Sequence, residues 1–443
     1  MGQTGTASRF AHPFFVSRKI ATKPKEPSVA RKDFKSIILR GGSFVGSRSN
    51  TPGASSMLSV EELKLSPRAS GHAGPSCLGN FLDDAHLAGR LYGSEGGGSP
   101  MSHLTANSGD DPSLNVDLVF GLDLGQDLDI MSPDFNVLLI RDQAALKQVV
   151  SHIFLTMVDQ RIHMSKNILK EYVHEVAVHY RPNPFHNFHH AVTVLQFLAV
   201  MLKTTREHVV FSEINVFAFL LSALVHDVDH PGKTNLFEIN SGSALALLYN
   251  DLSVLENHHC STAFRLMQKP GTNILSRLPF DQKKEVRKTL ISCVLATDMS
   301  KHSELIEDAK GRHIASDRPL DAADQQFFGK LFLHAADLSG PTKEFLVARE
   351  WASRVTEEFN AQVLVEVDLG LPVLSFMAAA DEKTFLKNEI GFSGFFVAPL
   401  WRIVSKLCPE LEYVHSQLER NINQYKSLRE EKERQEYAST LEK

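Results

Sequence analysis

Histidines and aspartates in the middle third of the chain have the types and spacing of a metal-binding hydrolytic site. They occur in three segments: residues 186–190 (HNFHH), 226–232 (HDVDHPG) and 336–339 (ADLS). Neutral imidazole and carboxylate are the ligand types that hold Zn²⁺, Mn²⁺ or Mg²⁺ in proteins. An acid placed directly after a histidine, as Asp227 follows His226, can reach a second ion while its neighbour holds the first. The pattern therefore predicts a two-metal site.

Each of these polar segments lies at the end of a predicted helix. Prolines just ahead of His186 indicate a helix start, on which His186 and His190, four residues apart, would share one face. His226 ends one long apolar run and Asp337 ends another. Ends of buried helices are rigid, so we expect the three segments to converge on one polar pocket.

Helical periodicity extends through most of the chain from about residue 135, with apolar residues spaced by three and four positions. The ranges that show it are 145–157, 168–179, 214–225, 243–250, 259–268, 282–297, 325–336, 345–362 and 395–406. We predict a further, charged helix over residues 411–432, followed by a polar tail from residue 433. Residues 363–373 are predicted to form a short strand or a loop. Strand alternation and internal repeats are not visible, so we predict an all-α fold with one large domain over residues 135–435.

Composition excludes several classes of protein. The 443 residues are 43% hydrophobic and 22% charged, and the net charge of −5 argues against a nucleic-acid binder. The four cysteines lack C-x-x-C spacing, which favours a reducing compartment over a disulfide framework or a thiolate metal site. The apolar runs at residues 191–202 and 216–225 are too short to cross a bilayer. We therefore expect a cytoplasmic protein.

Residues 1–130 differ from the rest of the chain. They are rich in Ser, Gly and Pro and show no sustained period, which predicts a mostly disordered tail. Residues 1–50 hold ten Lys and Arg against two acids, and the start MGQTGT fits the myristoylation pattern. An acyl chain beside a basic segment predicts peripheral membrane contact. A solvated basic tail and an organellar transit peptide remain alternatives, and a homodimer is also left open.

Five motifs occur in order along the chain: residues 185–192 (FHNFHHAV), 224–232 (LVHDVDHPG), 250–260 (NDLSVLENHHC), 295–302 (LATDMSKH) and 335–343 (AADLSGPTK). Together they resemble the catalytic domain of class I 3',5'-cyclic nucleotide phosphodiesterases, within the HD-type metal phosphohydrolase superfamily. The resemblance covers about residues 140–425. It implies an all-α domain of about sixteen helices that hydrolyses cAMP, cGMP or both to nucleoside 5'-monophosphates in cyclic-nucleotide signalling.

The resemblance also implies roles for particular residues. The ligands of a first, zinc-type ion would be His190, His226, Asp227 and Asp337. A second ion, Mg²⁺ or Mn²⁺, would share the Asp227 carboxylate. Positions that orient the waters on the ions are matched by His230, Glu256, Thr297 and Asp298. The position of the general acid is matched by His186, which would protonate the 3' oxygen while a hydroxide held between the two ions attacks phosphorus.

The substrate pocket departs from the family pattern. Glu389 stands where the family places a glutamine that reads the base, three residues before a phenylalanine that is retained here as Phe392. An ionised glutamate only accepts hydrogen bonds, whereas glutamine both donates and accepts. Gly340 replaces an asparagine common in the family, and Phe185 stands where some members have a tyrosine and cannot donate a hydrogen bond. We expect Phe185, Glu389 and Phe392 to line an altered base pocket, and the choice between cAMP and cGMP stays open.

Two other functions remain as alternatives. A cyclic-nucleotide-binding scaffold or sink with impaired turnover would explain the altered base pocket. An HD-type phosphohydrolase acting on another nucleotide would share the metal residues, although the ordered match extends well beyond them to Phe392.

Overall fold

The computed structural model describes residues 129–312 and 320–441 of the chain. Over these residues it consists of helices joined by turns and loops, and the all-α fold class is confirmed. The predictions of a disordered tail, a myristoylated N-terminus and a basic membrane-binding segment fall on residues outside the described ranges.

The described α-helices follow one another in this order: α2 (Gln143–Met157), α3 (Lys166–His179), α4 (Phe188–Thr205), α5 (Glu213–Val225), α6 (Asn235–Asn240), α7 (Ala244–Tyr249), α8 (Val254–Met267), α9 (Phe280–Val294), α10 (His302–Lys310), α11 (Ala322–Asp337), α12 (Phe345–Leu369), α13 (Glu382–Phe392), α14 (Ala398–Leu407) and α15 (Glu412–Leu441). Short 3₁₀ segments connect several of them, including η4 (Val137–Leu139), η5 (Met299–Lys301) and η6 (Gly340–Thr342). One turn of π-helix, η8 (Ser393–Val397), joins α13 to α14.

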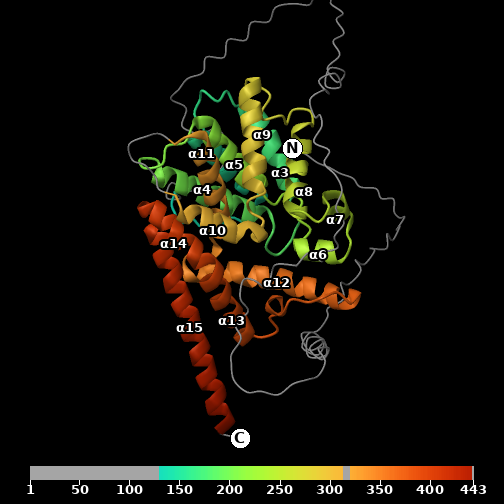
Figure 1. Ribbon diagram of the computed structural model, residues 1–443, viewed down its shortest axis with the longest axis vertical. Coiled ribbons are helices and arrows are strands. Elements are labelled where there is room, and N and C mark those ends of the chain that lie inside the picture. Colours follow the sequence, from blue (N-terminus) through green and yellow to red (C-terminus); the bar gives the residue numbers. More distant parts are fainter. Residues whose placement is uncertain (1–128, 313–319, 442–443) are drawn as a thin grey trace, which may run out of the picture. The chain divides into compact units, whose positions relative to one another are not determined.

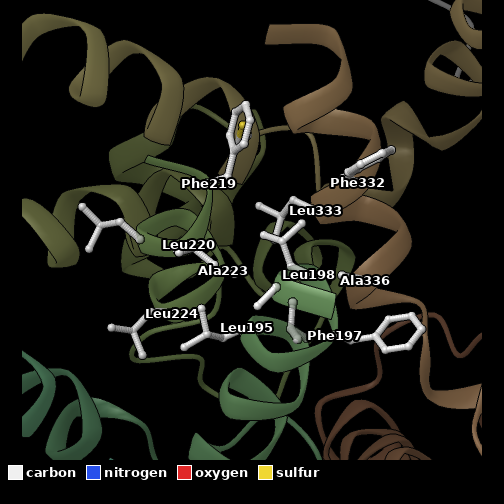
Figure 2. Packing of buried hydrophobic residues seen from close by; sticks show 14 of the residues in the cluster. Leu195, Phe197, Leu198, Phe219, Leu220, Ala223, Leu224, Phe332, Leu333 and Ala336 are labelled. Atoms are coloured by element: carbon white, nitrogen blue, oxygen red, sulfur yellow. The ribbon is translucent and has the colours of Figure 1, made fainter. Parts of the chain in front are cut away.

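Helices α4, α5 and α11 form the centre of the hydrophobic core (Figure 2). Both α4 and α5 are apolar on nearly every face, which is typical of helices surrounded by other helices. Gly329 allows α11 to approach α5 closely, because a Cβ there would lie 2.1 Å from the ring of Phe219. The core thus holds rigidly the three helices whose ends carry the predicted metal ligands.

A second, smaller cluster joins α12, α13 and α15. Its buried members are Phe345, Ala352, Phe385, Leu386 and Tyr425. The continuous helical stretch Glu382–Leu407 is long and apolar enough to cross a membrane by length and composition, but half of its most apolar window is buried. Because α13 and α14 both pack on α15, this stretch has the character of a core helix (Figure 1).

Three local predictions were wrong. Residues 363–369 are helical, because α12 continues as one helix to Leu369 and ends at Gly370, which adopts the left-handed conformation of a helix C-cap. The last helix continues past residue 433 to Leu441, supported by ion pairs such as Lys383–Glu436 with α13. His186 does not share a helix with His190: α4 begins only at Phe188, and Asn187 is its N-cap.

Candidate metal centre

Four side chains at or next to the ends of three helices converge on one point. The Nε2 atom of His190 lies 3.2 Å from Nε2 of His226, 3.3 Å from Oδ2 of Asp227 and 3.1 Å from Oδ1 of Asp337. Nε2 of His226 lies 3.1 Å from Asp227 Oδ2 and 3.3 Å from Asp337 Oδ1. The structure therefore brings together the four residues predicted to bind the first ion.

Local helix geometry places these side chains. Asn187 caps α4 by accepting a hydrogen bond from the His190 N–H, so His190 lies in the first turn. His226 is the C-cap of α5, and Asp337 is the last residue of α11. The His226 ring is fully buried and its Nδ1 donates to the carbonyl oxygen of Ala223, which leaves the Nε2 lone pair facing the cluster.

These residues fit a divalent cation. Ligand atoms about 2.0–2.2 Å from a common ion lie roughly 2.8–3.6 Å apart, depending on whether the geometry is octahedral or tetrahedral. The separations among the four side chains, 3.1–3.3 Å, fall within this range. Burial by itself would lower the pKa of His226, yet Asp227 and Asp337 outweigh it and raise that pKa well above its ordinary value. Imidazole lone pairs and carboxylates that converge on one point stabilise positive charge there. The four side chains are therefore able to hold a metal ion.

His186 lies beside the cluster and is held by Glu358 of α12. The Nδ1 atom of His186 donates to Oε1 of Glu358, and Oε2 of Glu358 accepts the backbone N–H groups of Phe185 (3.0 Å) and His186 (3.1 Å). Burial lowers the pKa of His186, but the Glu358 carboxylate outweighs burial and the net pKa is raised. This arrangement favours a protonated imidazole whose ring centre is 5.8 Å from that of His190.

His230 stacks on His186, with ring centres 3.9 Å apart. Its Nδ1 accepts the backbone N–H of Gly232, and burial followed by the charge of His186 holds its pKa well below the ordinary value. His230 is therefore neutral and carries its proton on Nε2. Gly232 has a φ of +71°, and a Cβ there would lie 3.0 Å from the side-chain oxygen of Asn183, so the turn requires glycine.

His259 faces the other oxygen of Asp227. Its Nδ1 donates to the carbonyl oxygen of Val228, and burial lowers its pKa to about 4. The lone pair on Nε2 therefore lies 3.7 Å from Oδ1 of Asp227, with an acceptor on each side. A cation or a bound water between these two atoms would satisfy both, and ligand-type atoms of Asp227, His230 and His259 lie within 4.8 Å of one another.

A buried acidic pair lies next to Asp227. Both oxygens of Glu256 accept from the amide of Asn235 at 3.0 Å, and burial together with Asp298 raises the pKa of Glu256 to about 8. Asp298 accepts a 2.7 Å hydrogen bond from Ser253. Asp227 also raises the pKa of Glu256, which shows that these carboxyls share one electrostatic environment. Thr297, also buried, donates its hydroxyl back to the carbonyl oxygen of Val294.

The predicted substrate residues fall into two groups. Phe185 packs on the His190 ring (centres 4.7 Å apart) and on Trp351 of α12 (5.6 Å). Glu389 and Phe392 lie on α13; Glu389 is buried, which raises its pKa to about 7, while Phe392 is partly exposed and contacts Phe396. The four metal-ligand candidates together with His186 and His230 are called the histidine cluster below. Within the described ranges, no hydrogen bond or ring contact joins Glu389 or Phe392 directly to it.

Sequence reasoning missed several residues that the structure places at this site: Asn235, His259, Trp351 and Glu358. Three of them are separated from the predicted motifs or belong to helices without a polar signature. His259 lies within the matched segment 250–260, but the sequence does not indicate that it lies beside Asp227. Glu358 is more than 170 residues from His186 in sequence, and only the packing of α12 brings them together.

Comparison with known proteins agrees with this geometry. Over residues 185–418 the chain matches the family described as 3'5'-cyclic nucleotide phosphodiesterase. It is 38% identical over 274 residues to the probable 3',5'-cyclic-AMP phosphodiesterase pde-4 of Caenorhabditis elegans, covering 60% of this chain and 40% of that protein. It is 35% identical over 243 residues to the high affinity cGMP-specific 3',5'-cyclic phosphodiesterase 9A of Drosophila melanogaster, covering 55% of this chain and 16% of that protein.

A solved structure is also similar. The crystal structure of the phosphodiesterase domain of the RhoPDE fusion protein from the choanoflagellate Salpingoeca rosetta aligns with a TM-score of 0.66 and 32% identity. That alignment covers 72% of this chain and 100% of the solved chain.

An all-α fold whose helix ends gather histidines and aspartates around one point defines a helical protein with a site able to hold a metal. The matched family covers more than half of the residues, and the chain belongs to the 3',5'-cyclic nucleotide phosphodiesterase family. The resemblance drawn from the five motifs is thereby confirmed. The chain spans only 40% and 16% of the length of the two curated relatives.

Proposed function

We propose that this protein hydrolyses 3',5'-cyclic nucleotides to nucleoside 5'-monophosphates in a metal-dependent reaction. The observation that carries this proposal is the convergence of four ligand-type side chains within 3.1–3.3 Å contacts, next to His186, whose pKa is raised by Glu358 against the effect of burial. Family membership supports the same reaction class, since the curated relatives are named as cAMP or cGMP phosphodiesterases.

The proposed ligands of the first ion, which we take to be Zn²⁺, are His190, His226, Asp227 and Asp337. We propose Mg²⁺ or Mn²⁺ as the second ion, sharing Asp227, with its waters oriented by His230, Glu256, Thr297 and Asp298. Divalent ions at these positions would neutralise phosphoryl oxygens and lower the pKa of water toward ~7. Neutral His230, with its proton on Nε2, is suited to donate a hydrogen bond there, while Glu256 with its raised pKa can both accept and donate.

His186 is the proposed general acid. When the bond between phosphorus and the 3' oxygen breaks, the leaving oxygen needs a proton, and a positioned acid typically contributes ~10²–10⁴ in rate. Glu358 keeps the proton on His186 and fixes the ring through Nδ1, so that Nε2 is the atom that donates. The three hydrogen bonds to Glu358 pin both its oxygens, which makes it a positioning residue for His186.

The base pocket is proposed to include Phe185, Glu389 and Phe392. Burial raises the pKa of Glu389 to about 7, so near neutral pH a substantial fraction of the carboxyl is protonated and can donate as well as accept. We propose that Glu389 weakens ordinary purine recognition or shifts it toward guanine. Comparison of kcat/KM for cAMP and cGMP between wild type and Glu389→Gln tests this, and unchanged values for both nucleotides would refute it.

The central experiment is hydrolysis of both nucleotides by the purified full chain, with defined Mg²⁺, Mn²⁺ and Zn²⁺ and with metal analysis of the protein. We expect 5'-monophosphate product that disappears in His186→Ala, while cluster metal is retained. Absence of product with both nucleotides and every metal would refute the proposal.

A nucleotide-binding scaffold is the second candidate, favoured by the buried carboxyl at position 389. It predicts saturable binding of cAMP or cGMP by wild type without turnover. An HD-type hydrolase acting on another nucleotide would instead release product from neither cyclic nucleotide. Hydrolysis and binding of cAMP and cGMP, measured together, therefore separate all three functions.

The remaining proposals concern the context of the catalytic domain. We propose a domain over residues 135–435 in a cytoplasmic protein, with peripheral membrane contact through the N-terminal segment and a homodimer as its assembly. In support of a slightly earlier domain start, Ile130 and Met131 are already part of the hydrophobic core. Fractionation of cells expressing wild type and Gly2→Ala would test the lipid anchor.

A further inference from the structure

A basic groove lies where the described part of the chain begins. It has a volume of about 480 Å³ and lies between described residues 131–133, the C-terminal end of α4 and the start of α15. Its lining comprises Met131, Pro133, Val200, Lys203, Thr204, Arg206, Glu207 and Tyr413. The groove is separate from the histidine cluster, whose residues do not line it.

The positive charge of the groove is only partly compensated within the described ranges. Lys203 and Arg206 are both exposed, and neither forms an ion pair or hydrogen bond with another residue that the structure describes. The lining contains a single acid, Glu207, so the groove carries a net positive charge. Tyr413, which is 40% exposed, adds an aromatic surface beside these cations.

The first described residues of the chain are fixed to α4 beside this groove. The side-chain amide of Gln196 on α4 donates to the carbonyl oxygens of both Ile130 and Ser132 at 2.8 Å. Met131 lines the groove, and its N–H donates to the side chain of Asp129, the first described residue. The first described residues of the chain therefore lie beside Lys203 and Arg206.

The sequence that precedes Asp129 has the opposite charge. Residues 110–128 contain five aspartates and no lysine, arginine or histidine. They also contain eight large apolar residues, six of them within residues 116–124. This segment contrasts with the basic residues 1–50 and combines negative charge with apolar side chains, which matches a groove lined by cations, Val200 and Tyr413.

We propose that residues 116–128 dock in this groove, with Asp123 and Asp127 facing Lys203 and Arg206. An extended chain advances at most about 3.3–3.6 Å per residue. The two to six residues that precede Asp129 are therefore long enough to reach across a groove of this size. Because the segment is tethered at Asp129, its effective concentration at the groove is high, which favours it over a separate partner.

Hydrogen–deuterium exchange of the full chain at low salt tests this docking. We compare wild type with the double variant Lys203→Glu/Arg206→Glu, and we follow peptides that cover residues 110–128. Two exposed ion pairs predict that exchange in these peptides becomes roughly two- to tenfold faster in the variant. Adding Asp123→Lys and Asp127→Lys to that variant should restore slow exchange, because the pairs re-form with reversed charges.

A matched control reverses Arg277 and Lys288, two exposed basic residues outside the groove, to glutamate. It makes the same change in net charge and should leave exchange of residues 110–128 as in wild type. If Lys203→Glu/Arg206→Glu lowers the Tm, the neutral pair Lys203→Gln/Arg206→Gln replaces it and should give the same direction of change.

Three results would overturn the proposal. Equal exchange of residues 110–128 in wild type and in the groove variants would show that the segment does not dock there. Protection that grows with protein concentration would assign the groove to a second copy of the chain. Binding of anionic phospholipid vesicles that depends on Lys203 and Arg206, without any effect on exchange of residues 110–128, would assign it to a lipid surface.

Discussion

Replacement of Glu389 by glutamine should stabilise the protein by an amount that depends on pH. Glu389 is only 6% exposed, and burial raises its pKa to about 7 from the ordinary 4.5. The folded state therefore favours the protonated carboxyl, so the contribution of Glu389 to stability is fully present below pH 4.5 and is lost as pH rises through 7. Glutamine keeps the shape of the protonated side chain but does not ionise.

The magnitude follows from the same pKa values. One pKa unit corresponds to about 1.4 kcal/mol, so full ionisation of Glu389 costs about 3 kcal/mol above pH 8. At pH 5 the cost is only about 1 kcal/mol, because the unfolded carboxyl is itself partly protonated there. Relative to wild type, Glu389→Gln should thus gain about 2 kcal/mol between pH 5 and pH 8.

The assay is urea denaturation of both proteins at pH 5, 6, 7 and 8, with the free energy of unfolding as the readout. Glu430→Gln is the matched control, because Glu430 is exposed on α15 and its removal should have the same small effect at every pH. A difference between wild type and Glu389→Gln that stays constant from pH 5 to pH 8 would refute the argument that burial holds this carboxyl protonated.

Three further predictions concern the histidine cluster and its surroundings. Glu358→Gln should lower the pKa of His186, move the alkaline limb of the kcat profile to lower pH and reduce kcat by roughly ten- to hundredfold; a profile unchanged in shape would count against the positioning role. Asp337→Asn should lower the metal content measured by elemental analysis and reduce kcat by more than about a hundredfold, with the overall fold retained by circular dichroism. Gly232→Ala should destabilise the protein by about 1–3 kcal/mol in denaturant titration, since it forces a Cβ into a left-handed turn against Asn183; an unchanged midpoint would contradict this.

The sequence was most informative where chemistry and local structure coincide. The four cluster residues His190, His226, Asp227 and Asp337 could be named from their types, spacing and motifs, and their positions at helix ends followed from apolar periodicity. These inferences are local, because a helix end depends on capping and burial within a few residues. The predicted helix boundary at residue 362 was wrong because α12 carries buried polar residues such as Glu366 beyond it, which weakens the apolar period.

Chain order and residue type thus determined the all-α fold class, the metal-type cluster and the family. Tertiary structure alone decided that Glu358 holds His186, that His259 faces Asp227, and that a basic groove lies where the chain enters at Asp129. The physical reason is that these relations depend on how helices distant in sequence pack against each other. Long-range packing is set by the shapes of many buried side chains together, and no local pattern of a few residues records it.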